Sequence, residues 1–433
     1  MNEVTVGIVS LFFLIALFLT GIELGFGMAV IGFLGFSYIV SVEAALNLLA
    51  TDVFETFSSY GFTVIPLFIL MGQIAFNAGI AKRLYTAAYK FIGHVPGGLA
   101  IATVVGATAF KAICGSSPAT AATFASVAVP EMDRYGYSRK LSTGVVAIVG
   151  TLGVLIPPSV LLIILGLITE ISIGRLFLAG LVPGLLIALF YAIIIVGWCK
   201  IDPSLGPKGE RFTWKEKIAA LPEVIWPILI FIVVMLGLMK GFFTPTEAGS
   251  VGTFAVLLLS VIKRDIDFRK YIKSLGEALR TACMVLMLIA GSMIMGHFLV
   301  VTKIPMIAAD WIAALPLNPY LIMLLIVIFF ELGGSFIDDL AFMILAVPIF
   351  FPAVKKLGFD PIWFCIIIAL QVMIGVVIPP VASNVFIVKN ITNEPIGVIY
   401  RGVLPFLISL IVAGILLFIF PQITLWLPSK LMR

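Results

Sequence analysis

Glycine- and proline-rich interruptions divide four long apolar segments of this sequence, and they carry most of its candidate chemistry. Two read GSSPAT (115–120) and GGSFIDD (333–339), and two read GVLIPPS (153–159) and GVVIPPV (375–381). Proline has no N–H and clashes with the carbonyl four residues earlier, so each Ile-Pro-Pro frees backbone carbonyls from helical pairing. Such carbonyls and the C-terminal ends of half-helices favour a hard cation such as sodium. The same prolines are also compatible with a simple helix kink.

Polar side chains at the interruptions extend this chemistry. An ionisable aspartate at membrane depth costs free energy, so Asp338 is by default a candidate for a functional role. Its other interpretation is a cap on the N-terminus of a helix. Half-helix N-termini favour an organic anion, to which Asn384 could donate hydrogen bonds; its other interpretation is a helix–helix hydrogen bond. The side-chain candidates for binding sodium or substrate are Ser116, Ser117, Thr120, Ser335, Asp338 and Asn384.

Other chemistries are not indicated. The four cysteines are widely spaced in apolar surroundings without a CxxC pair, so neither a disulfide framework nor a transition-metal site is expected. His94 and His297 are isolated in the sequence and favour structural roles. The patterns GxSxG, HExxH and GxxxxGK[ST] are absent, so hydrolysis and ATP binding are not expected. We expect no cofactor other than sodium ions.

The composition places these sites in or beside a lipid bilayer. The chain has 433 residues, of which 62% are hydrophobic and 11% charged, and its mean hydropathy is +1.22. Apolar runs of roughly 20 residues, enough for a helix to cross about 30 Å of hydrocarbon, recur along the chain. The sequence therefore predicts an all-α polytopic membrane protein in contact with lipid. The net charge of +5 does not indicate a nucleic-acid partner, because the basic residues cluster in loops.

The charged loops predict the orientation. Segment 41–60 has three acidic residues and no basic one, so it belongs outside, and two preceding spans place the N-terminus outside as well. We expect the C-terminus on the same, periplasmic side. By the positive-inside rule the cytoplasmic loops are those with the clusters Lys82/Arg83/Lys90, Arg134/Arg139/Lys140, Lys200 to Lys217 and Lys263 to Lys273.

Two apolar segments favour re-entrant hairpins over spans. Residues 97–131 lie between basic clusters, so both ends belong in the cytoplasm, and GSSP supplies a turn in the middle. Non-helical backbone at that depth requires protein or a polar cavity around it. A second hairpin is expected at about 318–352. The Ile-Pro-Pro motifs then break helices at about 141–169 and 360–390.

The second half of the chain repeats the first. Gly115 to Pro130 aligns with Gly333 to Pro348 at an offset of 218, and the Ile-Pro-Pro motifs align at an offset of 222. The charge pattern makes the copies inverted in the membrane, which is typical of secondary transporters with a site near the midplane. The expected organisation is scaffold helices at 1–60, a first inverted repeat at 61–199, a basic loop with central scaffold helices at 200–276, and a second inverted repeat at 277–425.

Several longer motifs strengthen this interpretation. They are GSSPATAATFASVAVPEM at the first hairpin, FFTPTEAGSVG at 242–252, AVPIFFP in the second hairpin, LGFDPIWF at 357–364 and IGVVIPPVASNVFIV around the second break. Together they resemble the large membrane subunit of tripartite ATP-independent periplasmic (TRAP) transporters over essentially the whole chain. The sialic-acid members carry D-L-T-P at the second hairpin, where this chain has Asp338, Asp339, Leu340 and Ala341, so the resemblance favours the dicarboxylate-type branch.

The resemblance implies an elevator-type transporter of the ion-transporter superfamily in the cytoplasmic (inner) membrane of a bacterium or archaeon. It implies sodium-coupled import of a small organic anion, a C4-dicarboxylate or a related carboxylate or sulfonate. It also implies two protein partners: a periplasmic substrate-binding protein, and a small four-helix membrane subunit that we expect to be a separate chain.

The family's sodium sites carry over by motif. The first falls on Gly115, Ser116 and Ser117 with Gly153, Ile156 and Pro157, and the second on Gly333, Ser335 and Asp338 with Gly375, Ile378 and Pro379. Two alternatives stay open. A stand-alone divalent-anion/sodium symporter shares the hairpins but needs no binding protein. An intramembrane enzyme could use Asp338 and Asp339, although adjacent helical residues point about 100° apart.

Overall fold

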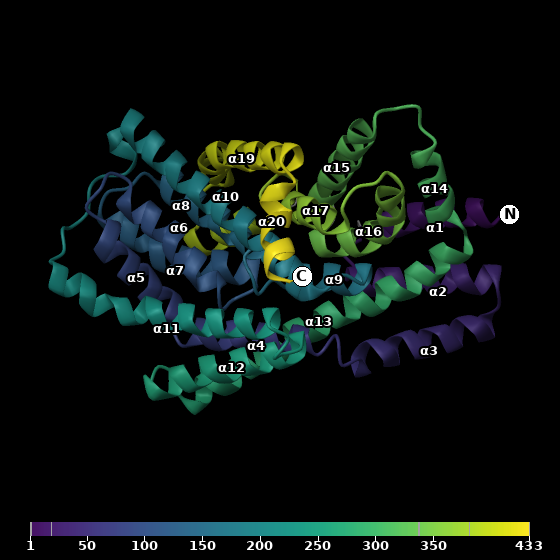
Figure 1. Ribbon diagram of the computed structural model, residues 1–433, viewed down its shortest axis with the longest axis horizontal. Helices are drawn as coiled ribbons and strands as arrows, with labels where there is room; N and C mark the ends of the chain where they lie inside the picture. Colours follow the sequence, from purple (N-terminus) through teal and green to yellow (C-terminus); the bar gives the residue numbers. More distant parts are fainter. Residues whose placement is uncertain (1, 19, 337, 381, 433) are drawn as a thin grey trace.

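The computed structural model describes residues 2–18, 20–336, 338–380 and 382–432, with only the backbone of residues 313, 336 and 339. Helices are the only regular secondary structure of this part of the chain, so the expected all-α fold class is confirmed. Figure 1 shows them as an elongated bundle with the N-terminus at one end and the C-terminus near the middle.

The first half of the chain contains α1 (Glu3–Phe18), α2 (Leu24–Ile39), α3 (Val42–Ser58), α4 (Val64–Asn77), α5 (Ile80–Ile92), α6 (Gly98–Lys111), α7 (Ser117–Arg134), α8 (Arg139–Val149), the 3-10 helix η1 (Gly150–Val154), α9 (Val160–Thr169) and α10 (Ile173–Ile201). After the 3-10 helix η2 (Pro203–Leu205), the second half contains α11 (Trp214–Met239), α12 (Pro245–Ile262), α13 (Phe268–Val301), α14 (Ile304–Ala313), α15 (Pro319–Phe336), α16 (Asp339–Lys356), α17 (Pro361–Gly375), α18 (Ser383–Thr392), α19 (Ile396–Ile419) and α20 (Gln422–Leu431).

Several helices are long and apolar enough to cross a bilayer. Among the described residues they are α10, α11, α12, α13 and α19, and α4 with α5 forms a sixth candidate that bends by 62°. This confirms the expected multi-pass membrane protein. Segment 41–60, expected only as an outside segment, forms the acidic helix α3.

The helices end where the sequence is interrupted. The helices α6 and α7 are joined through GSSPAT, and α15 and α16 through GGSFIDD. The helix α8 continues into η1 and stops at the first Ile-Pro-Pro before α9, and α17 stops at the second before α18. Re-entry of the hairpins into a membrane and the inverted relation of the two halves stay predictions.

Polar side chains cap the helices that begin at these interruptions. The Ser116 hydroxyl accepts a hydrogen bond from the Ala119 N–H at 3.3 Å, and the Ser159 hydroxyl accepts one from the Leu162 N–H at the same distance. The Asp338 carboxylate caps α16 in the same way. Since water is scarce at membrane depth, these caps satisfy N–H groups that would otherwise be unpaired.

Close packing at glycine joins α2 to α13, which lie side by side in Figure 1. A Cβ on Gly25 would lie 2.8 Å from the Met287 carbonyl oxygen, and one on Gly32 would lie 2.8 Å from the Met295 nitrogen. Small residues let membrane helices approach closely. These two helices therefore form a rigid pair.

The second segment of each broken helix packs against the hairpin of the other half of the chain. The helix α9 lies against α16, and α18 lies against α7 and α8. The four interruptions are therefore linked to one another through helix contacts.

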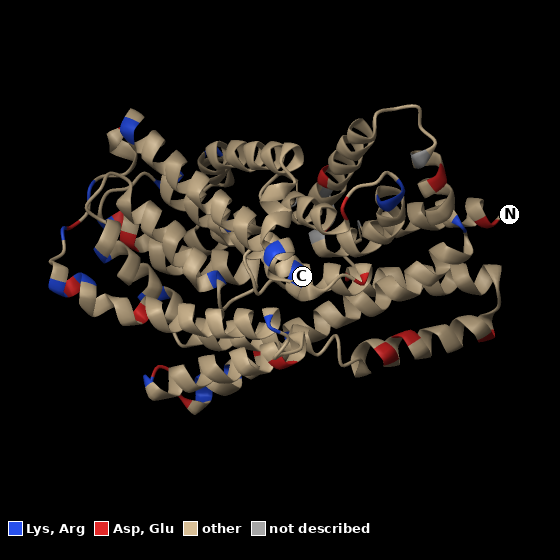
Figure 2. Cartoon of the chain, viewed as in Figure 1, with Lys and Arg blue, Asp and Glu red and all other residues tan. Residues whose placement is uncertain are grey.

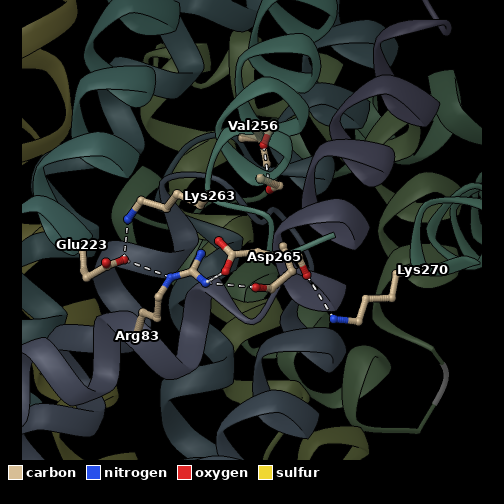
Figure 3. A network of polar contacts seen from close by, with 8 residues as sticks. Arg83, Glu223, Val256, Lys263, Asp265 and Lys270 are labelled. Carbon is tan, nitrogen blue, oxygen red and sulfur yellow. Dashed lines mark hydrogen bonds and ion pairs between the residues drawn. The ribbon is translucent and has the colours of Figure 1, made fainter. Parts of the chain in front are cut away.

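Charged side chains lie mostly away from these interruptions. In Figure 2 lysine and arginine gather at the left of the view, where α5 ends and α11 begins, and the central helices are largely uncharged. Figure 3 shows a polar network on this basic part of the chain: Arg83 of α5 pairs with Glu223 of α11 at 2.9 Å and with Asp265 at 2.8 Å. Lys263 pairs with the same Glu223 at 2.7 Å. The network ties α5 and α11 to the turn between α12 and α13.

Candidate functional site

The tip of the first hairpin is held together by one backbone carbonyl. The Ser116 carbonyl oxygen accepts hydrogen bonds from the Lys111 ammonium at 2.7 Å, from the Thr120 N–H at 3.2 Å and from the Thr120 hydroxyl at 3.0 Å. Lys111 is the last residue of α6 and is fully buried. Its ammonium therefore closes the turn between α6 and α7 from inside the protein.

The first tip contacts the first break directly. The Ser117 hydroxyl donates to the Gly150 carbonyl oxygen at 2.8 Å. A Cβ on Gly115 would collide with the Pro158 carbonyl oxygen, and one on Gly153 would collide with the Lys111 ammonium. The first tip thus touches the first break through Gly115 and Ser117, and the contact of Gly115 with the Pro158 carbonyl leaves no room for a Cβ.

The first break is fully covered. All residues from 150 to 159 are buried, Ile156 and Pro157 among them. The Ser159 hydroxyl donates to the Val154 carbonyl oxygen at 2.6 Å, and the Ile156 N–H donates to the Leu152 carbonyl oxygen at 3.0 Å. Two carbonyls of this break already have donors within the chain.

Asn384 joins the two halves of the molecule. It lies on α18, is fully buried, and its amide donates to the Ser117 hydroxyl at 3.2 Å and to the Ala147 carbonyl oxygen at 3.3 Å. These contacts correspond to a hydrogen bond between helices. They place Asn384 at the first tip with Ser116, Ser117 and Thr120.

The second tip is more open. Asp338 is exposed, and its carboxylate accepts from the Leu340 N–H at 3.1 Å and the Ala341 N–H at 3.2 Å. It lines a cavity of about 220 Å³ together with Glu23, just before α2, and Leu288 of α13. This cavity lies between the tip of the second hairpin and the α2–α13 pair, although α16 also packs directly against α13. Asp338 therefore caps α16 and still faces open space.

The other second-half candidates are divided between covered and exposed positions. Ser335 is buried, and its hydroxyl donates to the Glu331 carbonyl oxygen at 2.8 Å. Gly333 lies against the Phe342 ring. Of the second break, Gly375 is buried, Ile378 is half-buried and Pro379 is exposed. Val381, at the end of the same motif, lies outside the described residues.

Two charged side chains near the tips, whose charged atoms are covered, were not among the residues predicted from the sequence. Lys111 lies four residues before the first tip glycine, and Glu331 lies two residues before the second. Both carboxylate oxygens of Glu331 are buried and have no hydrogen-bond partner among the described residues. The available signal was an ionisable residue inside an otherwise apolar hairpin arm.

Comparisons with known proteins identify the family of this chain. Residues 11–423 match the model of the family described as "Tripartite ATP-independent periplasmic transporter, DctM component". The C4-dicarboxylate TRAP transporter large permease protein DctM of Pseudomonas aeruginosa is 36% identical over 88% of this chain and 90% of its own length. The isethionate TRAP transporter permease protein DctMQ of Oleidesulfovibrio alaskensis is 32% identical over 94% of this chain and 64% of its own length.

The fold also resembles a solved transporter. The crystal structure of the Alcanivorax borkumensis YdaH transporter matches with a TM-score of 0.65 and 14% identity, over 89% of this chain and 90% of that one. At that identity the likeness concerns the fold alone. The sequence relatives are transporter permease subunits, so the chain is not an enzyme and the aspartyl-enzyme alternative is set aside. The chain belongs to the DctM family, the large permease component of tripartite ATP-independent periplasmic transporters.

Proposed function

We propose that this chain is the permease subunit of a sodium-coupled importer for a small organic anion, a C4-dicarboxylate or a related carboxylate or sulfonate. The observation that carries the proposal is the position of Asp338 at the second hairpin tip, facing a cavity between the hairpin and the α2–α13 pair. Relatives named for C4-dicarboxylate and isethionate transport support the substrate class.

A sodium ion is the cation that best fits this tip. Asp338 offers carboxylate oxygen, and we expect the break at Gly375 to Pro379 to offer backbone oxygen; hard cations prefer both kinds of ligand. An anionic substrate beside the ion would gain from its charge. Sodium binding and substrate binding would then favour each other, which is the basis of coupling.

The movement we propose is an elevator. The hairpins and broken helices are packed against one another across the two halves, so they are suited to move as one body. The α2–α13 pair on the other side of the cavity is suited to stay in place as scaffold. Closing and opening of the second tip against that scaffold would cover and release the bound anion.

The proposed partners are a periplasmic substrate-binding protein and a small membrane subunit in a separate chain. The relative named DctMQ extends well beyond the aligned part, which is expected where two subunits are fused. We place the complex in the cytoplasmic membrane of a bacterium or archaeon, with both termini on the periplasmic side.

The test is uptake by proteoliposomes that contain the complete complex. The labelled probe is chosen by thermal-shift screening of the cognate binding protein against C4-dicarboxylates and isethionate. We expect uptake to require both an inward sodium gradient and the binding protein. Equal uptake with choline in place of sodium would refute the coupling, and equal uptake without the binding protein would favour a stand-alone symporter.

A further inference from the structure

The position of the Lys111 side chain bears on how many sodium ions this protein binds. Lys111 projects from the last turn of α6 and is fully buried. The C-terminal end of a helix carries partial negative charge, so a cation is favoured there. Lys111 takes part in none of the ion pairs that the described residues form. Its charge is therefore met by backbone oxygen instead of a carboxylate.

The ammonium lies between the first tip and the first break. It donates to the Ser116 carbonyl oxygen at 2.7 Å. On its other side it lies so close to Gly153 that a Cβ on that residue would collide with it. Ser116 and Gly153 are two of the positions at which the first sodium ion was expected. The ammonium thus lies where a metal cation would meet these two segments.

An ammonium and a sodium ion are alternative occupants of such a place. Both carry one positive charge and both are met by oxygen, but the ammonium is tethered and donates directed hydrogen bonds. Two like charges a few ångströms apart in a buried, low-dielectric place repel strongly. A protonated Lys111 therefore disfavours a sodium ion at the first tip.

The second hairpin has the opposite charge. The repeat offset of 218 places Phe329 at the position that corresponds to Lys111, and phenylalanine supplies no cation. Instead the second hairpin carries the carboxylates of Glu331 and Asp338. The first hairpin thus carries the cationic side chain of Lys111, and the second hairpin carries carboxylates that attract a cation.

The geometry points to Lys111 as a built-in cation that takes the place of the first sodium ion, so that sodium binds only at the second hairpin. This inference rests on the proposed sodium coupling and refines it. The hydrogen bond of the ammonium to Ser116 holds the turn of the first tip, and the Ser117 hydroxyl bonded to the Gly150 carbonyl oxygen keeps that tip closed on its break throughout the transport cycle. The sodium-dependent step is then confined to the second tip.

The experiment counts bound sodium ions by equilibrium binding of radioactive sodium to the purified complex. The variants are Lys111→Ser, which removes the ammonium and leaves room and a hydroxyl, and Lys240→Ser as a control at an exposed lysine. We expect one ion per wild-type permease, one in Lys240→Ser and two in Lys111→Ser. Two ions in the wild type, or no gain in a folded Lys111→Ser, would overturn the inference.

Other outcomes separate this inference from the proposed function. If the wild type binds no sodium but Lys111→Ser gains one ion, the built-in cation is supported and the sodium coupling is refuted. If Lys111→Ser does not fold, the inference is tested by the number of sodium ions that the wild type binds and by the dependence of wild-type uptake on sodium concentration. A Hill coefficient near one supports a single ion, and a value near two overturns the inference.

Discussion

The two hairpin tips have closely related sequences but differ in exposure and charge. At the first, the tip and its break are packed together, the whole break is buried, and the Lys111 ammonium fills the space between them. At the second, Asp338 faces a cavity and Pro379 is exposed. The duplicated motif thus forms a closed first hairpin tip that contains the Lys111 ammonium and an open second tip that carries acidic side chains. This difference is the reason for proposing the sodium site at the second hairpin.

The largest expected effect is that of Asp338→Asn, with Asp360→Asn as its matched control. Asp360 is exposed and caps α17 through the Ile362 and Trp363 N–H groups, just as Asp338 caps α16. Asparagine is an equally good cap, so both variants should fold. Removing a charged sodium ligand costs about 1.5–3 kcal/mol, so sodium affinity should fall about 10- to 100-fold in Asp338→Asn alone.

The measurement for this pair is the sodium concentration that gives half-maximal uptake. Equal behaviour of the two variants would show that Asp338 is only a cap. In that case the carboxylate of Asp338 would not be the group that binds sodium.

The next effect compares the glycines of the two tips. Alanine at Gly115 meets a backbone carbonyl oxygen, that of Pro158, whereas alanine at Gly333 meets the Phe342 ring. A ring can shift more readily than a backbone, so Gly115→Ala should destabilise the protein by about 1–3 kcal/mol and Gly333→Ala by less. Thermal unfolding of the two purified variants measures this difference. A greater loss in Gly333→Ala would mean that the first tip is not the tightly closed one.

A smaller effect is expected from the side chains that hold the tips. Asn384→Ala removes hydrogen bonds to the Ser117 hydroxyl and the Ala147 carbonyl oxygen in a buried place, at a cost of about 1–3 kcal/mol. Ser335→Ala removes one hydrogen bond within a single helix and should cost about 1 kcal/mol or less. Chemical denaturation measures the free energy of unfolding of the two variants. Equal losses would contradict the hydrogen-bonded link that Asn384 makes between the two halves of the chain.

Local features of the fold could be predicted from the sequence, because glycine, proline and capping residues act on their immediate neighbours. The turns at GSSPAT and GGSFIDD and the breaks at both Ile-Pro-Pro motifs lie at helix ends in the structure. The helix α3 was missed as a helix because its apolar residues do not form a long continuous run.

The contacts between distant residues could not be predicted. The pairing of Lys111 with the first break and of Asn384 with Ser117 depends on how helices far apart in the chain pack. The exposure of Asp338 also depends on packing, since the cavity beside it is formed with α2 and α13. The sequence showed which groups carry charge, and only the fold shows which of them are covered.

The most direct test of the account is accumulation of the substrate against its own gradient in proteoliposomes with the complete complex. Sodium is set higher outside than inside, and a sodium ionophore or a protonophore is then added. Sodium coupling predicts that accumulated substrate leaves when the ionophore collapses the sodium gradient and stays when only the proton gradient is collapsed. Accumulation that survives the ionophore but is lost with the protonophore would contradict it.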